Sequence, residues 1–206
     1  MKSNFLKRFI SSIILLPILL LLVYYGNFYY ELLLIIIFIA GSKEIFYLNH
    51  KLSKIFVFVL FVFFLIASYK LRNFKNGLEI TFLVIIITIL SDTGGYFFGK
   101  MFGKKKINFI SPNKTYEGFL GSLLFAQLIF LYVIHFNIIL FDSLIMTSVF
   151  FFISSLFVIL GDLFFSYCKR INKIKDFSKI FPGHGGLFDR IDGMIFITIF
   201  YYFYFK

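Results

Sequence analysis

The chain has 206 residues, of which 60% are hydrophobic and only 15% are charged. Soluble domains are about half apolar and about a quarter charged, so this composition excludes an ordinary soluble globular protein. The net charge of +11 does not indicate a nucleic-acid partner, because basic residues also collect in the cytoplasmic loops of membrane proteins and no nucleic-acid-binding motif is present.

Apolar runs recur along the whole chain. A membrane-spanning helix needs about 20 mostly apolar residues, and apolar runs occur at 9–25, 28–40, 55–69, 80–98, 119–136, 144–167 and 187–205. The second and third runs are shorter than a full span, so the number of spans could differ by one. The sequence therefore predicts an all-α, polytopic integral membrane protein with about seven transmembrane helices, in one domain over residues 1–206. The first run follows basic residues but precedes no small-residue cleavage site, which favours a retained anchor over a signal peptide.

The basic residues predict the orientation. With a cytoplasmic N-terminus and seven spans, the cytoplasmic side would hold Lys43, Lys51, Lys54 and the basic residues of 100–114 and 169–179. The opposite side would hold Lys70, Arg72, Lys75 and Lys206. Because lysine and arginine are enriched in cytoplasmic loops, we expect a multi-pass protein of the cytoplasmic (inner) membrane. We also expect its polar segments to face the cytoplasm.

The first polar stretch lies at 91–118. Asp92, Tyr96 and Lys100 are spaced at i, i+4 and i+8, which places them on one helix face. Lys114 and Glu117 fall in a turn that opens the next helix, where a helix N-terminus favours phosphate. The alternative is that Asp92 simply ends a helix in water and that the lysines only set the orientation.

The second stretch lies at 161–170, at the end of a long apolar run. Asp162, Ser166 and Lys169 fall at i, i+4 and i+7, on one face. A carboxylate, a hydroxyl and a cation on one stripe suit a magnesium-bound phosphate. The alternative is a structural salt bridge from Asp162 to Arg190.

The third stretch, 175–192, combines glycines with acids. Gly183, Gly185 and Gly186 allow close backbone approach to a ligand, and the helix that follows would aim free N–H groups at a phosphate. Asp189 and Asp192 lie at i, i+3 at the head of that helix. Ionisable residues in membrane spans are costly and are functional candidates by default.

The last two stretches resemble the signature of the phosphatidate cytidylyltransferases, the CDP-diacylglycerol synthase family. The resemblance rests on Ser166, Lys169, Arg170, Lys175, Asp176, Ser178, Phe181, Pro182, His184, Gly185, Gly186, Leu187, Asp189, Arg190, Ile191 and Asp192. The segments 92–100 and 111–118 are similar to earlier blocks of the same family. Three positions depart from the pattern: Phe165 replaces a common glutamate, Gly95 stands where alanine is usual, and Cys168 stands where a bulkier apolar residue is usual.

The resemblance implies that CTP and phosphatidic acid react to give CDP-diacylglycerol and pyrophosphate at the lipid bilayer. The catalytic residues would be Asp162, Ser166, Lys169, Arg170, Asp189 and Arg190. The substrate-binding residues would be Asp92, Lys114, Glu117, Lys175, Asp176, His184, Gly185 and Gly186. A magnesium ion, with a second cation as an option, would be held by Asp162, Asp189 and Asp192. The resemblance also suggests a homodimer.

Two alternative functions remain open. A CTP-dependent polyprenol or lipid kinase would release CDP instead of pyrophosphate, but the long glycine-histidine signature argues against it. An ion-coupled membrane transporter would use the buried acids to relay protons or bind cations. Transporters tend to show two similar halves, and no internal repeat is present in this sequence.

Overall fold

The computed structural model describes residues 16–107, 114–136, 143–180 and 185–206. These residues form a short helix, Leu16–Tyr25, followed by α2 (Asn27–Phe46), α3 (Lys51–Arg72), α4 (Gly77–Phe102), α5 (Tyr116–Ala126), α6 (Ile129–His135), α7 (Leu144–Ile171) and α8 (Phe188–Phe205). An isolated bridge between Lys106 and Thr115 is the one β-type pairing within these ranges. The all-α class predicted from the sequence is confirmed.

Four helices of the described chain are long and apolar enough to cross a membrane. They are α3, α4, the combined segment Tyr116–His135 and α7. A multi-pass membrane protein is therefore confirmed, whereas the count of seven spans is not. Helices do occupy the other predicted positions, but Leu16–Tyr25 is short, and α2 and α8 each carry several charged residues.

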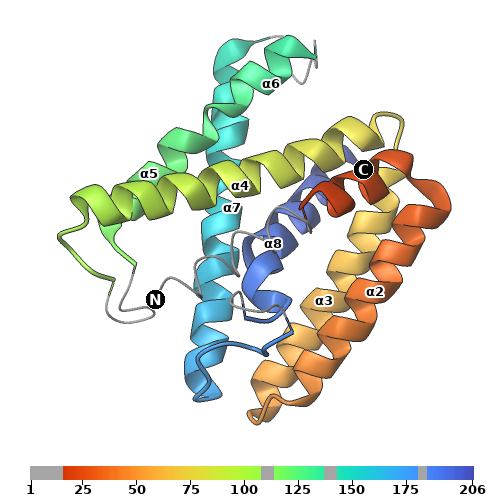
Figure 1. Cartoon of the computed structure of the whole chain (residues 1–206). Helices are drawn as coiled ribbons and strands as arrows, with labels where there is room; N and C mark the ends of the chain where they lie inside the picture. Colours follow the sequence, from red (N-terminus) through yellow and green to blue (C-terminus); the bar gives the residue numbers. More distant parts are fainter. Residues whose placement is uncertain (1–15, 108–113, 137–142, 181–184) are drawn as a thin grey trace.

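The helices form two groups that meet at α8 (Figure 1). α2 and α3 form an antiparallel hairpin, and α8 packs between α3 and α7. α4 crosses in front of α7 and packs closely along α5. The polar ends of α4, α7 and α8 are thereby brought to one region.

Glycines make the contact between α4 and α5 unusually close. A Cβ atom on Gly94 would overlap the carbonyl oxygen of Gly121, and one on Gly121 would lie 2.6 Å from the carbonyl oxygen of Gly94. Small residues at membrane helix interfaces allow the backbones to approach. Ser91 adds a polar link, because its Oγ lies 3.1 Å from Oγ of Ser155 on α7.

The basic residues separate toward the two ends of α3. The backbone N–H of His50 donates to Oδ1 of Asn172 (2.8 Å), and Nδ2 of Asn172 donates to Oγ of Ser53 (2.7 Å). These bonds join the start of α3 to the end of α7, so Lys51, Lys54 and the lysines of 169–179 share one end of the molecule. α3 has 22 residues and is about 33 Å long, close to the thickness of the bilayer core. Lys70 and Arg72, in the last turn of α3, and Lys75 just after it therefore lie at the opposite end of this helix.

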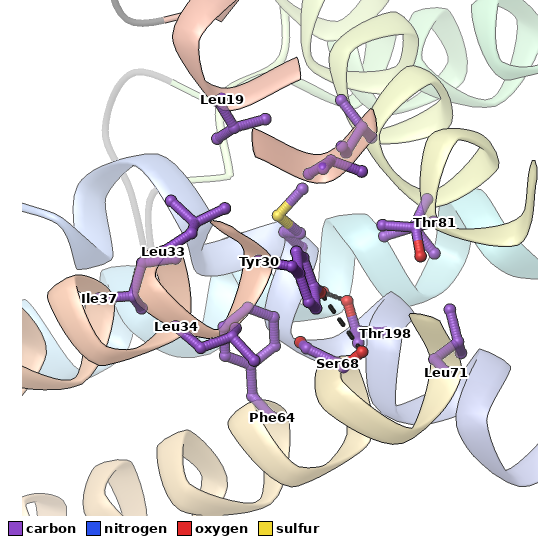
Figure 2. Close-up of a pocket in the computed structure, with 14 residues that line it drawn as sticks. Leu19, Tyr30, Leu33, Leu34, Ile37, Phe64, Ser68, Leu71, Thr81 and Thr198 are labelled. Atoms are coloured by element: carbon purple, nitrogen blue, oxygen red, sulfur yellow. Dashed lines mark hydrogen bonds between the residues drawn. The ribbon is translucent and has the colours of Figure 1, made fainter. Parts of the chain in front are cut away.

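A small apolar pocket lies beside the hairpin formed by α2 and α3 (Figure 2). It has a volume of about 50 Å³ and is lined by side chains of Leu16–Tyr25, α2, α3, α4 and α8. Its polar groups are hydroxyls, among them Tyr30, which donates to the carbonyl of Ser68 at 3.3 Å. The lining contains neither a carboxylate nor a basic side chain, so it is unsuited to phosphate chemistry.

Candidate active site

A larger cavity of about 560 Å³ lies where α4, α5, α7 and α8 meet. Its lining combines apolar and glycine positions with two lysines and four carboxylates, namely Lys100, Lys114, Asp92, Asp162, Asp189 and Asp192. Every one of these residues was singled out from the sequence. The three polar stretches, which are well separated in the chain, therefore converge on one site.

A close helix crossing brings Asp162 and Asp192 to the same cavity. At this crossing, a Cβ atom on Gly161 of α7 would overlap the carbonyl oxygen of Asp192 and lie 3.0 Å from Cα of Gly193, both on α8. The absence of a side chain at Gly161 lets the two backbones touch. Asp162, the next residue, then faces the same space as Asp192.

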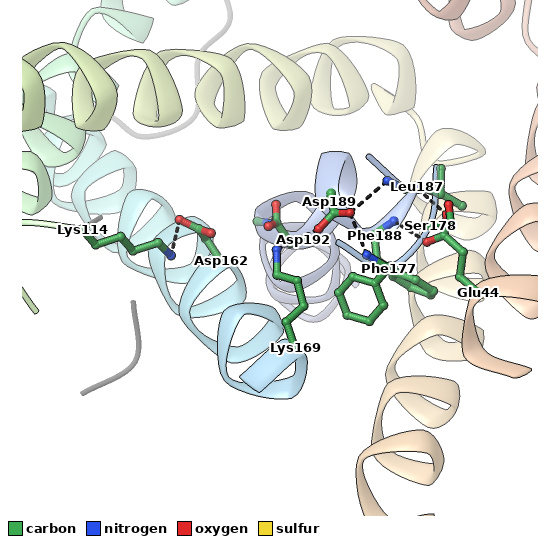
Figure 3. A network of polar contacts seen from close by, with 12 residues as sticks. Glu44, Lys114, Asp162, Lys169, Phe177, Ser178, Leu187, Phe188, Asp189 and Asp192 are labelled. Carbon is green, nitrogen blue, oxygen red and sulfur yellow. Dashed lines mark hydrogen bonds and ion pairs between the residues drawn. The ribbon is translucent and has the colours of Figure 1, made fainter. Parts of the chain in front are cut away.

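Asp162 forms an ion pair with Lys114. Nζ of Lys114 lies 2.5 Å from Oδ2 of Asp162, and the two side chains are 24% and 36% exposed. Lys114 comes from the segment immediately before α5, so the pair joins that segment to α7 (Figure 3). The structural salt bridge considered from the sequence had Arg190 as the partner of Asp162; the ion pair found here is with Lys114.

Asp189 forms an ion pair with Lys169 and also accepts hydrogen bonds from the backbone of the segments before α8. Its Oδ1 accepts a hydrogen bond from Nζ of Lys169 at 2.7 Å. Its Oδ2 accepts from the backbone N–H groups of Phe177 (3.0 Å) and Gly186 (2.9 Å). The side chain of Asp189 is only 5% exposed, so these contacts hold a largely buried carboxylate at the cavity wall.

Glu44 of α2 is a further polar residue near the site that the sequence reasoning missed. It is 1% exposed, and its carboxylate accepts from the Ser178 hydroxyl (2.6 Å), the Leu187 N–H (2.6 Å) and the Phe188 N–H (3.0 Å). The rule that selects ionisable residues within membrane spans would have found it. The second apolar run was taken to end at residue 40, however, which left Glu44 outside the predicted span.

These contacts correct the expectation of free N–H groups at the start of α8. The N–H of Gly186 binds Asp189, and those of Leu187 and Phe188 bind Glu44. A helix N-terminus needs partners for its first N–H groups, and in this protein buried carboxylates supply them. Gly185 has a φ of +85°, a backbone conformation that glycine adopts at little cost.

The predicted polar face of α4 is confirmed. Asp92, Tyr96 and Lys100 all line the cavity, as their spacing of four residues requires. Nζ of Lys100 lies 5.7 Å from the centre of the Tyr96 ring, within the range of a cation–π contact. Asp92 therefore faces this cavity.

The turn that opens α5 is also confirmed, but Glu117 has a different place in it. The Thr115 hydroxyl caps the helix by accepting from the Gly118 N–H at 3.0 Å. The Glu117 carboxylate accepts from the Lys105 N–H at 3.3 and 3.4 Å. Glu117 does not line the cavity, and its contacts brace the turn that carries Lys114.

The other predicted site residues that the structure describes do not line the cavity. Ser166 is buried within α7, whereas Arg170, Lys175, Asp176 and Arg190 are exposed. His184 falls outside the described residues. Of the three residues predicted to share a face of α7, Asp162 and Lys169 form ion pairs, with Lys114 and Asp189 respectively. The hydroxyl of Ser166 is buried inside the protein.

Phe165, one of the positions that depart from the family pattern, packs against aromatic residues on both sides of the loop before α8. It is fully buried and stacks on Phe188 with ring centres 5.4 Å apart. It also contacts Phe177, with ring centres 5.9 Å apart. Phe165 is therefore part of an aromatic core.

The carboxylates that line the cavity are of a chemical type that suits a hard divalent cation. Magnesium prefers oxygen ligands and uses one or two carboxylates together with substrate phosphates. Within the described residues, no three acidic, histidine or cysteine side chains converge closely enough to form a complete metal cluster. A cation that completes its coordination with substrate oxygens does not require such a cluster.

Comparison with known proteins shows the family of this chain. A model described as the cytidylyltransferase family matches residues 47–206. A phosphatidate cytidylyltransferase of Staphylococcus aureus (strain COL) is 43% identical over 150 residues, covering 71% of this chain and 54% of the relative. One from Staphylococcus saprophyticus subsp. saprophyticus is 41% identical over 133 residues, covering 63% and 50%. The chain thus spans about half the length of the curated relatives it matches. The resemblance found in the sequence is confirmed, and the chain belongs to the cytidylyltransferase family.

Proposed function

We propose that this protein transfers a cytidylyl group from CTP to phosphatidic acid, giving CDP-diacylglycerol and pyrophosphate. The observation that carries the proposal is the single cavity lined by four aspartates and two lysines, inside the segment that matches the family. The relatives named phosphatidate cytidylyltransferase support the choice of lipid substrate.

The reaction needs no nucleophile from the protein. A phosphate oxygen of phosphatidic acid attacks the α-phosphorus of CTP, a new P–O bond forms, and the bond to the β-phosphate breaks to release pyrophosphate. Catalysis of such transfers rests on positioning and on neutralising charge. Lys114 and Lys169 are suited to this role, since each already places its ammonium group beside a carboxylate at the cavity wall.

Asp162, Asp189 and Asp192 are the residues that would hold magnesium in this site. The bound cation would neutralise the triphosphate and favour departure of pyrophosphate. Asp92 adds a fourth carboxylate to the same cavity, which leaves a second cation as an option. Lys100 and the exposed Lys104 to Lys106 would attract the anionic nucleotide and lipid headgroups.

The membrane arrangement completes the proposal. We place Lys51, Lys54 and residues 169–179 on the cytoplasmic side, because lysine is enriched there and CTP is a cytoplasmic nucleotide. α2, α8 and the first apolar run would then be the remaining spans of a seven-helix protein. A homodimer remains a prediction from the family resemblance.

The test is a product analysis of the purified protein in detergent. Phosphatidic acid, CTP and Mg²⁺ should give CDP-diacylglycerol and pyrophosphate in equal amounts, and EDTA should stop the reaction until Mg²⁺ is restored. Release of CDP with a phosphorylated prenol would instead identify a lipid kinase. If neither product forms and reconstituted vesicles show cation-dependent transport, the transporter alternative replaces the proposal.

A further inference from the structure

We propose that Glu44 is a positioning residue that holds the loop before α8 and thereby sets the place of Asp189 and Asp192 in the cavity. The proposal rests on the cytidylyltransferase function proposed above. Glu44 lies outside the family-matched residues 47–206 and does not line the cavity. Its effect on the reaction would therefore be indirect.

The loop before α8 is held from two sides by carboxylates. Asp189 accepts from the N–H groups of Phe177 and Gly186. Glu44 accepts hydrogen bonds from the residues that follow these two in the chain, namely from the Ser178 hydroxyl and the Leu187 N–H. It also accepts one from the Phe188 N–H. Each acid thus joins the segment around 177 to the segment around 187, as Figure 3 shows.

The fit around Glu44 is close at Gly186, the described part of the loop that lies directly before α8. A Cβ atom on Gly186 would lie 2.5 Å from Oε1 and 2.8 Å from Oε2 of Glu44. The loop backbone therefore rests directly on the carboxylate. Because Leu187 and Phe188 immediately precede Asp189, a shift of these residues would move the Asp189 carboxylate and the Lys169 ammonium group bound to it.

The charge of Glu44 matters as well as its shape. Its described hydrogen-bond partners are all donors, one hydroxyl and two N–H groups. A negative group at a helix N-terminus is also favoured by the helix dipole. A glutamine has the same size but presents an NH₂ group where one of these donors needs an acceptor. Replacement by glutamine should therefore disturb the loop without leaving a hole in the core.

The decisive variant is Glu44→Gln, with Glu31→Gln as the matched control, because Glu31 is exposed on the same helix. Two readouts are needed. Hydrogen exchange measures the protection of the Leu187 and Phe188 amides, independently of activity. Steady-state kinetics with CTP and phosphatidic acid, together with the melting temperature in detergent, separate positioning from loss of fold.

For Glu44→Gln we expect faster exchange at residues 187 and 188. We also expect a fall in kcat/KM of about 10- to 100-fold, as for loss of a hydrogen bond to a charged group. The fall should appear mainly in kcat and should persist well below the melting temperature. Glu31→Gln should match the wild type in both readouts.

Wild-type exchange or wild-type kcat/KM in Glu44→Gln would overturn the proposal. So would a loss of activity explained wholly by the unfolded fraction. If Glu44→Gln does not fold, Ser178→Ala decides: it removes one of the three bonds and should lower kcat/KM severalfold in a folded protein, and an unchanged value would overturn the proposal. If the wild type forms no CDP-diacylglycerol, the proposed function fails, whereas exchange at 187 and 188 still tests whether Glu44 holds the loop.

Discussion

Lys114 and Asp162 form an ion pair of 2.5 Å that closes one side of the cavity. Lys114 stands just before α5 and Asp162 lies within α7, so the pair fixes the turn before α5 against α7. Nζ of Lys114 is itself buried from solvent. Removing Asp162 would leave this buried ammonium group without its counter-charge, which is costly.

We therefore expect Lys114→Met to lower kcat/KM by about 10- to 100-fold, through loss of a charged hydrogen-bonding group worth about 1.5–3 kcal/mol. The KM for CTP should rise, since the ammonium group is placed to bind phosphate. Steady-state kinetics at several CTP concentrations measures both effects. Lys106→Met is a suitable control, because Lys106 is exposed in the same region and does not line the cavity. Equal values of kcat/KM and KM for the two variants would show that Lys114 does not act in the active site.

Asp162 and Asp189 should differ in what their loss does to the loop. Asp162→Asn and Asp189→Asn should each reduce kcat/KM at least about 100-fold, or about 2.7 kcal/mol of transition-state stabilisation, while the protein remains inserted in the membrane. Only Asp189→Asn should also speed amide exchange at Phe177 and Gly186, because Asp189 alone binds those N–H groups. Full activity in either variant would contradict the assignment of the metal-binding residues.

Gly161 should tolerate no side chain. In Gly161→Ala the new methyl group would meet the backbone of Asp192 and Gly193, which cannot move aside as a side chain can. Overpacking of this kind costs about 1–3 kcal/mol, and the melting temperature in detergent should fall. Gly95→Ala is the matched comparison, since the close atom there is the rotatable Ser122 hydroxyl, and alanine favours helix by about 1 kcal/mol. A lower melting temperature for Gly95→Ala than for Gly161→Ala would refute this account of the crossing.

Phe165 should not tolerate replacement by glutamate, the residue that the family resemblance led us to expect at this position. Phe165→Glu would place a carboxylate among Phe177 and Phe188, and a buried polar group without a partner costs several kcal/mol, roughly 2–7. We expect a strong loss of stability and activity. Phe165→Leu, which keeps the site apolar, should lose much less. Thermal unfolding and product formation of the two variants measure the difference, and a fully stable Phe165→Glu would show that this core accepts a charge.

The two ends of α3 should label from opposite sides of the membrane. Lys51→Cys and Lys75→Cys, each made in a Cys168→Ala background, place single thiols at exposed positions. A membrane-impermeant maleimide should label Lys75→Cys in intact cells and should label Lys51→Cys only after the membrane is opened. The reverse pattern would invert the proposed orientation and place the cavity on the outer side.

The sequence by itself determined the class of fold, the positions of the helices and the family. Helix formation and membrane insertion depend on local hydropathy over about 20 residues, which is why runs such as 55–69 and 144–167 reappear in α3 and α7. The spacing of Asp92, Tyr96 and Lys100 likewise fixed their common face, because the helical repeat is a local property. The acids were identified because charge is rare in such segments.

Only the tertiary structure decided which charged groups meet. The pairs Lys114–Asp162 and Lys169–Asp189 join segments distant in the chain, and spacing along the sequence carries no information about contacts between helices. The role of Glu44 was hidden for the same reason, since its partners lie more than 130 positions away. The start of α8 looked open to phosphate because its N–H groups must bind something. In the folded protein the buried carboxylate of Glu44, on α2, accepts hydrogen bonds from the N–H groups of Leu187 and Phe188, where we had expected a phosphate.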